Sequence, residues 1–286
     1  YCIIPSLRGK FRSVPEERLL KQAEYMASQG VKELILVAQE TTVYGTDLYG
    51  KKTLHILLKK LCQIKGIRWI RILYCYPEEI YDELIQVMKE EKKICHYLDL
   101  PIQHASDRIL RRMGRRTSKA QLVDIITKLR REIPDIVLRT SLITGFPGET
   151  EEDHQELMEF VDEMEFDRLG VFTYSPEEGT PAETMEGQVP EELKEERRDE
   201  IMELQQEISL EKGNDRIGQE LLVMIEGKVS GESAYIGRTY GDAPKVDGYM
   251  FVQTGEMLVT GDFAKVKVTG ALEYDLIGEL ADEYAE

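Results

Sequence analysis

The chain has 286 residues, of which 42% are hydrophobic and 32% charged, and its formal net charge is −17. This length suffices for one large hydrophobic core and a small second one, and because no apolar run approaches about 18 residues, we expect no membrane-spanning helix. The acidic charge disfavours a protein that grips nucleic acid through its phosphates and favours basic partners.

The chain begins with Tyr1-Cys2 rather than with methionine, so we expect it to be part of a longer protein. The other cysteines, Cys62, Cys75 and Cys95, stand far apart and form no Cys-x-x-Cys pair. This spacing argues against a disulfide framework and against a zinc ribbon. We expect the three later cysteines to be buried core residues, and the protein to be cytoplasmic.

Between residues 33 and 175, short apolar runs alternate with amphipathic helical stretches. The runs are rich in Ile, Leu and Val with little polar alternation, which is typical of parallel strands covered on both faces. The predicted strands are 33–38, 69–76, 97–102, 136–145 and 169–174.

Helical spacing of apolar residues predicts helices over 15–28, 78–91 and 118–133, and a fourth that begins after Thr150. Thr150-Glu151-Glu152-Asp153 has the pattern of a capping box. Repeated strand–helix units predict right-handed crossovers in a parallel sheet. With five strands in view, a partial barrel or an open sheet fits better than a complete eight-stranded barrel.

The last third of the chain has a different pattern. Residues 190–214 predict a long charged helix with Ile201, Leu204 and Ile208 as its apolar stripe. Short strands separated by turn signals such as Asp247-Gly248 follow. They are 220–225, 234–238, 249–253, 263–269 and 274–277, which predict a small β-barrel of the OB type.

Polar residues gather where the predicted parallel strands end, and ligands bind at the C-terminal ends of such strands. Each group also fits a structural role: His104 as a satisfied polar residue, or Gly145 and Gly148 as a turn before a helix cap. Several polar strand ends in one sheet favour a binding site over unrelated structural roles. The candidates are Gln39, Glu40 and Thr41 after the first strand, Gln103, His104 and Ser106 after the third, and Gly145 and Glu149 after the fourth.

Arg139 lies within the fourth predicted strand, which is otherwise largely apolar. A buried guanidinium needs an anionic partner, and a substrate carboxylate would serve. Arg139 is therefore a further candidate binding residue.

Taken in order, these segments resemble the radical S-adenosylmethionine methylthiotransferases, and most closely the branch that modifies an aspartate of a small-subunit ribosomal protein. Residues 237–240, 242–244 and 273–276 resemble the TRAM domain of that family. The other segments that carry the likeness are Tyr1-Cys2-Ile3-Ile4-Pro5, 8–13, Ala38-Gln39-Glu40-Thr41-Thr42, 101–108, Gly145-Phe146-Pro147-Gly148-Glu149-Thr150 and 166–172.

The resemblance implies an α/β fold with a partial (β/α), TIM-like radical-SAM barrel over residues 1–213 and a small all-β, OB-like TRAM domain over residues 214–286. The family has a further N-terminal domain that binds a second 4Fe-4S cluster. By resemblance, that domain, the first barrel strand and two of the three cysteines of the radical cluster are missing from this chain.

The implied cofactors are S-adenosylmethionine and, in an intact enzyme, two 4Fe-4S clusters. In the implied reaction, a 5′-deoxyadenosyl radical removes a hydrogen from the aspartate β-carbon, and a methylthio group is added there. The implied roles are as follows: Cys2 as the third thiolate of the radical cluster, Gln39, Glu40 and Thr41 near the methionine amino group, Gln103, His104 and Ser106 at ribose and carboxylate contacts, Arg139 at the methionine carboxylate, and Gly145 to Glu149 as the adenine-side turn.

A sister branch of the family modifies an adenosine in tRNA. Residues 214–286 hold six Lys and Arg against fourteen Asp and Glu, a formal charge of −8. A module that binds RNA should be basic, whereas an acidic one complements a basic ribosomal protein. We therefore expect a ribosomal protein substrate bound through the TRAM domain, and no direct RNA binding. A catalytically inactive binding fragment is a further interpretation, because the chain carries one cluster cysteine of three.

Overall fold

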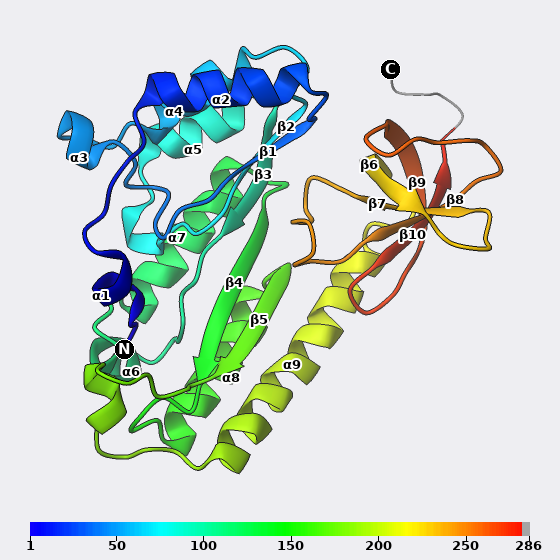
Figure 1. Cartoon of the computed structure of the whole chain (residues 1–286). Coiled ribbons are helices and arrows are strands. Elements are labelled where there is room, and N and C mark those ends of the chain that lie inside the picture. Colours follow the sequence, from blue (N-terminus) through cyan, green and yellow to red (C-terminus); the bar gives the residue numbers. More distant parts are fainter. Residues whose placement is uncertain (282–286) are drawn as a thin grey trace.

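The N-terminal part of the chain builds one parallel sheet, in a computed structural model that describes residues 1–281. Strands that are neighbours in the sequence are also neighbours in the sheet, so the sheet curves as a segment of a barrel (Figure 1). This confirms the predicted α/β partial barrel. The strands, in sheet order, are β1 (Glu33–Leu36), β2 (Trp69–Ile72), β3 (Ile94–Asp99), β4 (Val137–Thr144) and β5 (Arg168–Thr173).

Helices follow the strands and pack on the outer face of the curved sheet (Figure 1). Their apolar stripes meet the strands in one core, in which Leu58, Ile70 and Leu142 are completely buried. The long helices are α2 (Glu16–Ser28), α4 (Leu54–Cys62), α5 (Asp82–Glu90), α7 (Lys119–Glu132) and α8 (Glu151–Met164). The short elements are α1 (Ile4–Arg8), α3 (Thr46–Tyr49), α6 (Asp107–Arg112) and the 3₁₀ turns η1 (Pro77–Glu79) and η2 (Pro181–Thr184).

One local prediction from the sequence pattern, the helix cap at Thr150, is confirmed, and another, the length of the second strand, is wrong. The capping box predicted at Thr150 is present, with reciprocal hydrogen bonds between Thr150 and Asp153. The predicted strand over 69–76 is too long, because β2 ends at Ile72 and Tyr74 takes a positive φ of 57°. Cys75 is still completely buried, so the apolar pattern continues past the end of the strand.

Helix α9 (Glu191–Asn214) joins the sheet to the C-terminal part of the chain. Its 24 residues extend about 36 Å, packing along β5 and α8 and reaching the C-terminal strands (Figure 1). Ile201 and Ile208 are buried as predicted, and Leu204 is partly buried. The buried face also includes Lys194 and Arg197 near the start of the helix.

The C-terminal strands form the closed barrel that the short-strand pattern predicts, in the order β10-β8-β7-β6-β9. Its core holds Val223, Met250 and Val266. The last five residues of the domain predicted over 214–286 lie outside the described residues. The strands are β6 (Glu220–Lys228), β7 (Ala234–Arg238), β8 (Met250–Gln253), β9 (Phe263–Ala271) and β10 (Leu276–Leu280).

The barrel and the sheet share a hydrophobic cluster at the amino ends of the sheet strands. Trp69 and Val137 of the sheet pack with Ala243 and Phe263 of the barrel, and the Trp69 and Phe263 rings meet edge to face with centroids 4.9 Å apart. Among residues 1–281 we find no helix that combines the length and apolar composition needed to cross a bilayer.

Candidate functional site

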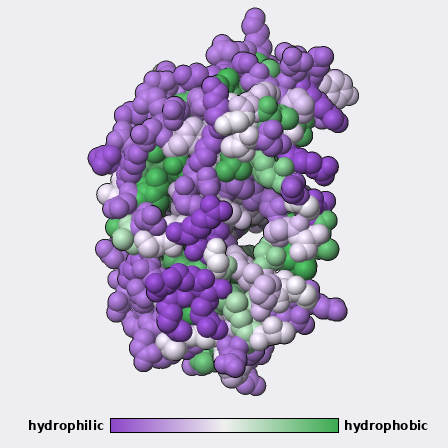
Figure 2. All heavy atoms as spheres, turned by 90° about the vertical axis from the view of Figure 1, so that its left-hand side faces the viewer, coloured by the Kyte–Doolittle hydropathy of each residue, from purple (hydrophilic) through white to green (hydrophobic). Residues whose placement is uncertain are grey.

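The loops that follow β1 to β4 lie on one side of the sheet, here called the carboxyl edge. It consists of residues 37–45, 73–77, 100–106 and 145–150, which follow the four strands in turn. Figure 2 shows the side of the molecule on which the N-terminal segment lies. Most of it is hydrophilic, and apolar residues occur in small patches around a central hollow.

Glu40 and Thr41 tie the loop after β1 to the loop after β2. One carboxylate oxygen of Glu40 accepts hydrogen bonds from the backbone N–H and the hydroxyl of Thr42, and the other accepts from Tyr76 N at 2.8 Å. Thr41 donates through its N–H to Tyr74 O and through its hydroxyl to Leu73 O. Gln39 is exposed to solvent, so it is the member of this triplet that is free to meet a ligand.

Burial sets the acidity of Glu40. The loss of water raises its pKa from 4.5 to about 7, although the N–H groups of Thr42 and Tyr76 oppose this change. A carboxyl group that titrates near neutral pH in a loop of a curved sheet is typical of binding and catalytic sites. A cation bound nearby would favour the ionised form of this carboxyl group and lower its pKa.

Tyr74 and Gln103 both adopt left-handed backbone conformations, with φ of 57° and 73°. For residues other than glycine this conformation costs about 1–2 kcal/mol, so the surrounding contacts must maintain it. The Asp99 carboxylate accepts a hydrogen bond from Tyr74 N at 3.2 Å. Gln103 exchanges backbone hydrogen bonds with Ser141 and Ile143 of β4.

His104 is completely buried. Its Nδ1 atom accepts hydrogen bonds from Ala105 N at 3.0 Å and Ser106 N at 2.9 Å, so the proton of the neutral ring is on Nε2. The Nε2 atom faces a Glu149 carboxylate oxygen at 3.5 Å. His104 therefore holds the loop after β3 through these hydrogen bonds, and its ring is not accessible to solvent.

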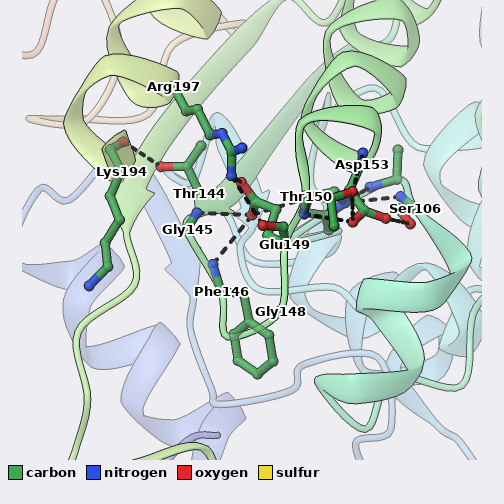
Figure 3. Close-up of polar contacts among 12 residues, drawn as sticks. Ser106, Thr144, Gly145, Phe146, Gly148, Glu149, Thr150, Asp153, Lys194 and Arg197 are labelled. Atoms are coloured by element: carbon green, nitrogen blue, oxygen red, sulfur yellow. Dashed lines mark hydrogen bonds and ion pairs between the residues drawn. The ribbon is translucent and has the colours of Figure 1, made fainter. Parts of the chain in front are cut away.

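Glu149 holds the turn after β4 (Figure 3). One oxygen accepts from Gly145 N at 2.9 Å and Phe146 N at 3.3 Å, and the other from the Arg197 guanidinium at 2.9 Å. Burial raises the pKa of Glu149, but His104, the Gly145 N–H and Arg197 outweigh it, so the pKa lies below its usual value. The carboxylate is thus ionised and fully used inside the protein.

Ser106 is joined to the start of α8 (Figure 3). Its hydroxyl donates to an Asp153 carboxylate oxygen at 2.6 Å, and Asp153 also accepts from Thr150 N and pairs with Arg108. Burial raises the pKa of Asp153, but the contacts with Arg108 and Ser106 lower it more strongly. The buried Ser106 hydroxyl therefore positions the loop after β3.

The glycines of the turn after β4 are explained by packing. Gly145 has φ of 70°, and a Cβ atom there would overlap the Lys194 side chain. Gly148 has φ of 83°, and a Cβ atom would lie 2.9 Å from Arg112 Nε. The structural interpretation of these glycines thus has direct support, independent of any ligand.

Arg139 lies level with Asp99, the last residue of β3, and about 20 Å along the chain from the turn at Gly145. Its NH1 group donates to Asp99 at 2.7 Å, and its Nε lies 3.4 Å from a carboxylate oxygen of Asp247 in the C-terminal barrel. The structure does not bring Arg139 together with Glu149. Two carboxylates already occupy its guanidinium, so its position gives no support to the role predicted at a ligand carboxylate.

Cys2 is exposed, whereas Cys62, Cys75 and Cys95 are buried as expected. The neighbouring Tyr1 ring packs edge to face against Phe146, with centroids 5.9 Å apart. This contact places the N-terminal segment beside the turn after β4, at the carboxyl edge. Among residues 1–281 there is no group of three or more His, Cys, Asp or Glu that could hold a metal ion. Cys2 alone does not satisfy a 4Fe-4S cluster, which is held by several thiolates.

The structure adds residues that the sequence pattern does not single out. Arg197 and Lys194 reach the turn after β4 from α9, and Asp99 and Tyr74 form the corner after β2. Charged residues on a long charged helix resemble a solvated face in sequence, and a positive φ at tyrosine has no sequence signal. Asp153 has one signal, its place in the capping box.

Comparisons with known families and proteins cover the whole chain. The sequence model described as "Radical SAM superfamily" matches residues 1–161, and the one described as "TRAM domain" matches residues 217–281. The "Ribosomal protein uS12 methylthiotransferase RimO" of Lachnoclostridium phytofermentans is 64% identical over 278 residues, covering 97% of this chain and 63% of the relative. The protein of the same name from Clostridium botulinum strain Langeland is 54% identical over 286 residues, covering all of this chain and 64% of the relative. The chain thus spans less than two thirds of the length of these relatives.

Among solved structures, the radical SAM enzyme coproporphyrinogen III oxidase (HemN) from Escherichia coli superposes with a TM-score of 0.53 and 15% identity. The superposition covers 88% of this chain and 60% of that one. At this identity the likeness concerns the fold alone.

Proposed function

Since the chain belongs to the radical SAM superfamily, we propose that it forms the greater part of a methylthiotransferase that modifies an aspartate of ribosomal protein uS12. The observation that carries this proposal is the 64% identity over 278 residues to a relative with that name. The identity extends through both the curved sheet and the C-terminal barrel. An enzyme acting on a ribosomal protein would work in the cytoplasm.

The carboxyl edge is the proposed S-adenosylmethionine site. Gln39 is exposed and Glu40 carries a pKa raised by burial to about 7, so a bound ammonium group would favour the ionised form of Glu40. Gln103 and the loop that carries Thr41 would make further contacts with S-adenosylmethionine. Ser106 and Glu149 are buried and hydrogen-bonded within the protein, and buried His104 accepts two backbone hydrogen bonds through Nδ1. Their proposed role is to hold the loops in place.

The proposed 4Fe-4S cluster takes Cys2 as one of its three thiolates. Bound together, the cluster and S-adenosylmethionine would supply the radical chemistry. The proposed role of the chain itself is to hold Cys2 beside the carboxyl edge through the Tyr1–Phe146 contact, to orient the cofactor, and to exclude water. We propose that the other two cysteines belong to sequence that precedes Tyr1 in the intact enzyme.

We propose further that the parallel barrel, residues 1–213, is completed by a strand beside β1. In the described sheet β1 is an edge strand, and a cavity of about 410 Å³ lies along it, lined by residues that include Leu19, Leu34, Leu36 and Leu57. Unpaired N–H and C=O groups on a strand next to apolar space favour the addition of another strand. The C-terminal domain, residues 214–286, is the proposed substrate-docking module.

The charge of this module supports a basic protein substrate. Arg238, Asp242 and Asp247 lie buried against the sheet, and without them the formal charge of residues 214–286 is −7. Such a surface repels RNA phosphates and attracts a basic ribosomal protein.

The decisive experiment uses the intact, reconstituted enzyme with S-adenosylmethionine and a reductant, offered either uS12 or unmodified tRNA. We expect a methylthio mass increase on one aspartate of uS12 and none on tRNA, measured by mass spectrometry. Modified adenosine in tRNA alone would instead support the sister activity. The 286-residue chain alone should give no full 4Fe-4S absorption band after reconstitution.

The site assignment has its own test. In the intact enzyme, Glu40→Gln should weaken S-adenosylmethionine binding about tenfold above pH 7, because a buried charge pair is lost. Wild-type affinity should fall between pH 8 and pH 6 as Glu40 takes up a proton, whereas the variant should show little pH dependence. Unchanged affinity in the variant would remove Glu40 from the site.

A further inference from the structure

The C-terminal barrel inserts its β7–β8 connection, residues 239–249, against the sheet. This connection is here called the interface loop. Asp242 pairs with Arg168 of β5 at 2.6 Å, and Asp247 accepts a hydrogen bond from the Tyr97 hydroxyl of β3 at 2.7 Å. Just before the loop, Arg238 pairs with Glu33 of β1 at 2.6 Å. These are buried contacts, so the barrel is part of the interior of the protein at this end of the sheet.

One line of polar contacts continues from the interface loop toward the carboxyl edge. Asp247 lies 3.4 Å from Arg139 Nε, Arg139 NH1 donates to Asp99 at 2.7 Å, and the other Asp99 oxygen accepts from Tyr74 N at 3.2 Å. The side chains of Asp247 and Asp99 are 3% and 5% exposed. The Arg139–Asp99 contact is a short charge-assisted hydrogen bond, whereas Asp247 and Arg139 form an ion pair; both contacts are shielded from water.

The line ends at the turn after β2, here called the corner, which hydrogen-bonds to the loop that carries Gln39, Glu40 and Thr41. Asp99 holds Tyr74 N through its carboxylate and Cys75 N through its carbonyl oxygen. Tyr74 O in turn accepts from Thr41 N, and Tyr76 N donates to Glu40. Because Tyr74 has a left-handed backbone, the corner needs outside contacts to keep its shape.

We propose that Asp247, Arg139 and Asp99 act as a relay of positioning residues, through which the C-terminal barrel fixes the loop that carries Gln39, Glu40 and Thr41. The barrel is then a working part of the cofactor site as well as a docking module. The relay rests on the proposed function for its link to S-adenosylmethionine, but its mechanical part, the control of the loop, stands on this chain alone.

A purely stabilising role would treat all buried contacts of the interface alike. The Arg238–Glu33 pair provides the matched control. It also crosses the interface, with side chains 2% and 6% exposed, but Glu33 is the first residue of β1 and its other partner is Arg71. The pair has no direct contact with Asp99 or Tyr74; its nearest connection to the relay is the stacking of Arg71 over the Tyr97 ring, whose hydroxyl donates to Asp247. Arg238→Gln should therefore disturb the interface with little effect on the corner.

The first experiment measures hydrogen exchange in the 286-residue chain without cofactors. Asp247→Asn and Arg139→Gln should speed amide exchange of peptides covering residues 39–44 and 73–77 at least fivefold. Arg238→Gln should speed exchange near residues 33 and 71 and leave those two peptides within twofold of wild type. Tyr97→Phe, which removes one donor to Asp247 but leaves Arg139 in place, should have a small effect. Equal exchange at residues 39–44 in Asp247→Asn and Arg238→Gln would overturn the relay.

The second experiment measures S-adenosylmethionine binding to the intact enzyme by calorimetry, with thermal unfolding as the check on folding. Asp247→Asn should weaken binding roughly 5- to 20-fold, and Arg238→Gln less than twofold, even if both lower the melting temperature equally. Weakened binding in proportion to lost stability in both variants would also overturn the proposal. If wild-type enzyme binds no S-adenosylmethionine, the proposed function fails, while the exchange data still decide the mechanical relay.

Discussion

Glu149 and Arg197 form a buried ion pair, with 2.9 Å between a carboxylate oxygen and a guanidinium nitrogen and with both side chains almost inaccessible. The pair joins the turn after β4 to the first turns of α9. At the opposite end of the same helix, Gly213 packs against Ala271 and Leu276 of the C-terminal barrel. One helix thus connects the carboxyl edge of the sheet to the barrel through fixed contacts at both ends.

Removing the charge of Glu149 should be strongly destabilising. Glu149→Gln leaves the buried Arg197 without its main partner, and breaking a buried pair in this way costs about 3–5 kcal/mol. Glu151 also pairs with Arg197, at 3.2 Å, but its side chain is 72% exposed, so Glu151→Gln should cost at most about 1 kcal/mol. Urea unfolding of both variants measures the difference. Similar losses in the two variants would contradict the assignment of Glu149 as the main partner.

Glu40 should make stability depend on pH. Its pKa is raised from 4.5 to about 7 in the folded chain, so between these values the folded state holds a proton that the unfolded state has released. The free energy of unfolding should therefore fall as pH rises from about 4.5 to about 7, by roughly 3 kcal/mol. Glu40→Gln should remove this slope. The check is urea unfolding at a series of pH values, with the variant curve subtracted from the wild-type curve; a difference that rises with pH would contradict the prediction.

Gly145 should not tolerate a side chain. Gly145→Ala combines an unfavourable φ with overlap of Lys194 and should cost about 3 kcal/mol. Gly179→Ala is the matched control, since Gly179 has φ of 80° but open space around it, and it should cost about 1–2 kcal/mol. Adding Lys194→Ala to Gly145→Ala should remove the closest overlap, which is with Lys194 Cγ, so the double variant should be at least 0.5 kcal/mol more stable than the sum of single effects. Strict additivity would show that the overlap is not the cause.

One cysteine of the native chain should react with thiol reagents. Burial raises the pKa of the Cys62 and Cys95 thiols to about 12 and raises that of Cys75 as well, so these three should react only after unfolding. Cys2 is exposed and should react within minutes. Absorbance after addition of dithiobis-nitrobenzoate, with Cys2→Ser as the control, gives the count. More than one rapid equivalent in native protein would show that a buried cysteine is reached.

Much of the fold follows from patterns that sequence carries directly. The apolar runs around Leu34, Ile70 and Leu142 locate the sheet, and the turn signals around Asp247-Gly248 locate strands of the small barrel. The strand ends are less predictable, because Tyr74 and Gln103 turn the chain with positive φ values that tertiary contacts impose.

The sequence predicts where the candidate site lies better than it predicts what each residue of the site does. The sequence pattern brings Glu40, Gln103 and His104 to strand ends, which is where the structure has them. It does not distinguish the exposed Gln39 from the buried His104, since both are polar residues after a strand. The partner of Arg139 was not predictable either: Asp247 lies 108 positions later in the chain, on a separate barrel.

The interface loop has a practical consequence for anyone who would exchange the C-terminal barrel between related proteins. Grafting at the end of α9 would transplant Arg238, Asp242 and Asp247 without their partners Glu33, Arg168, Tyr97 and Arg139. Each mismatch would strand a charge or a hydroxyl in a dry interior. A stable chimera would have to include the residues on both sides of this interface, so the sheet and the barrel should be exchanged together.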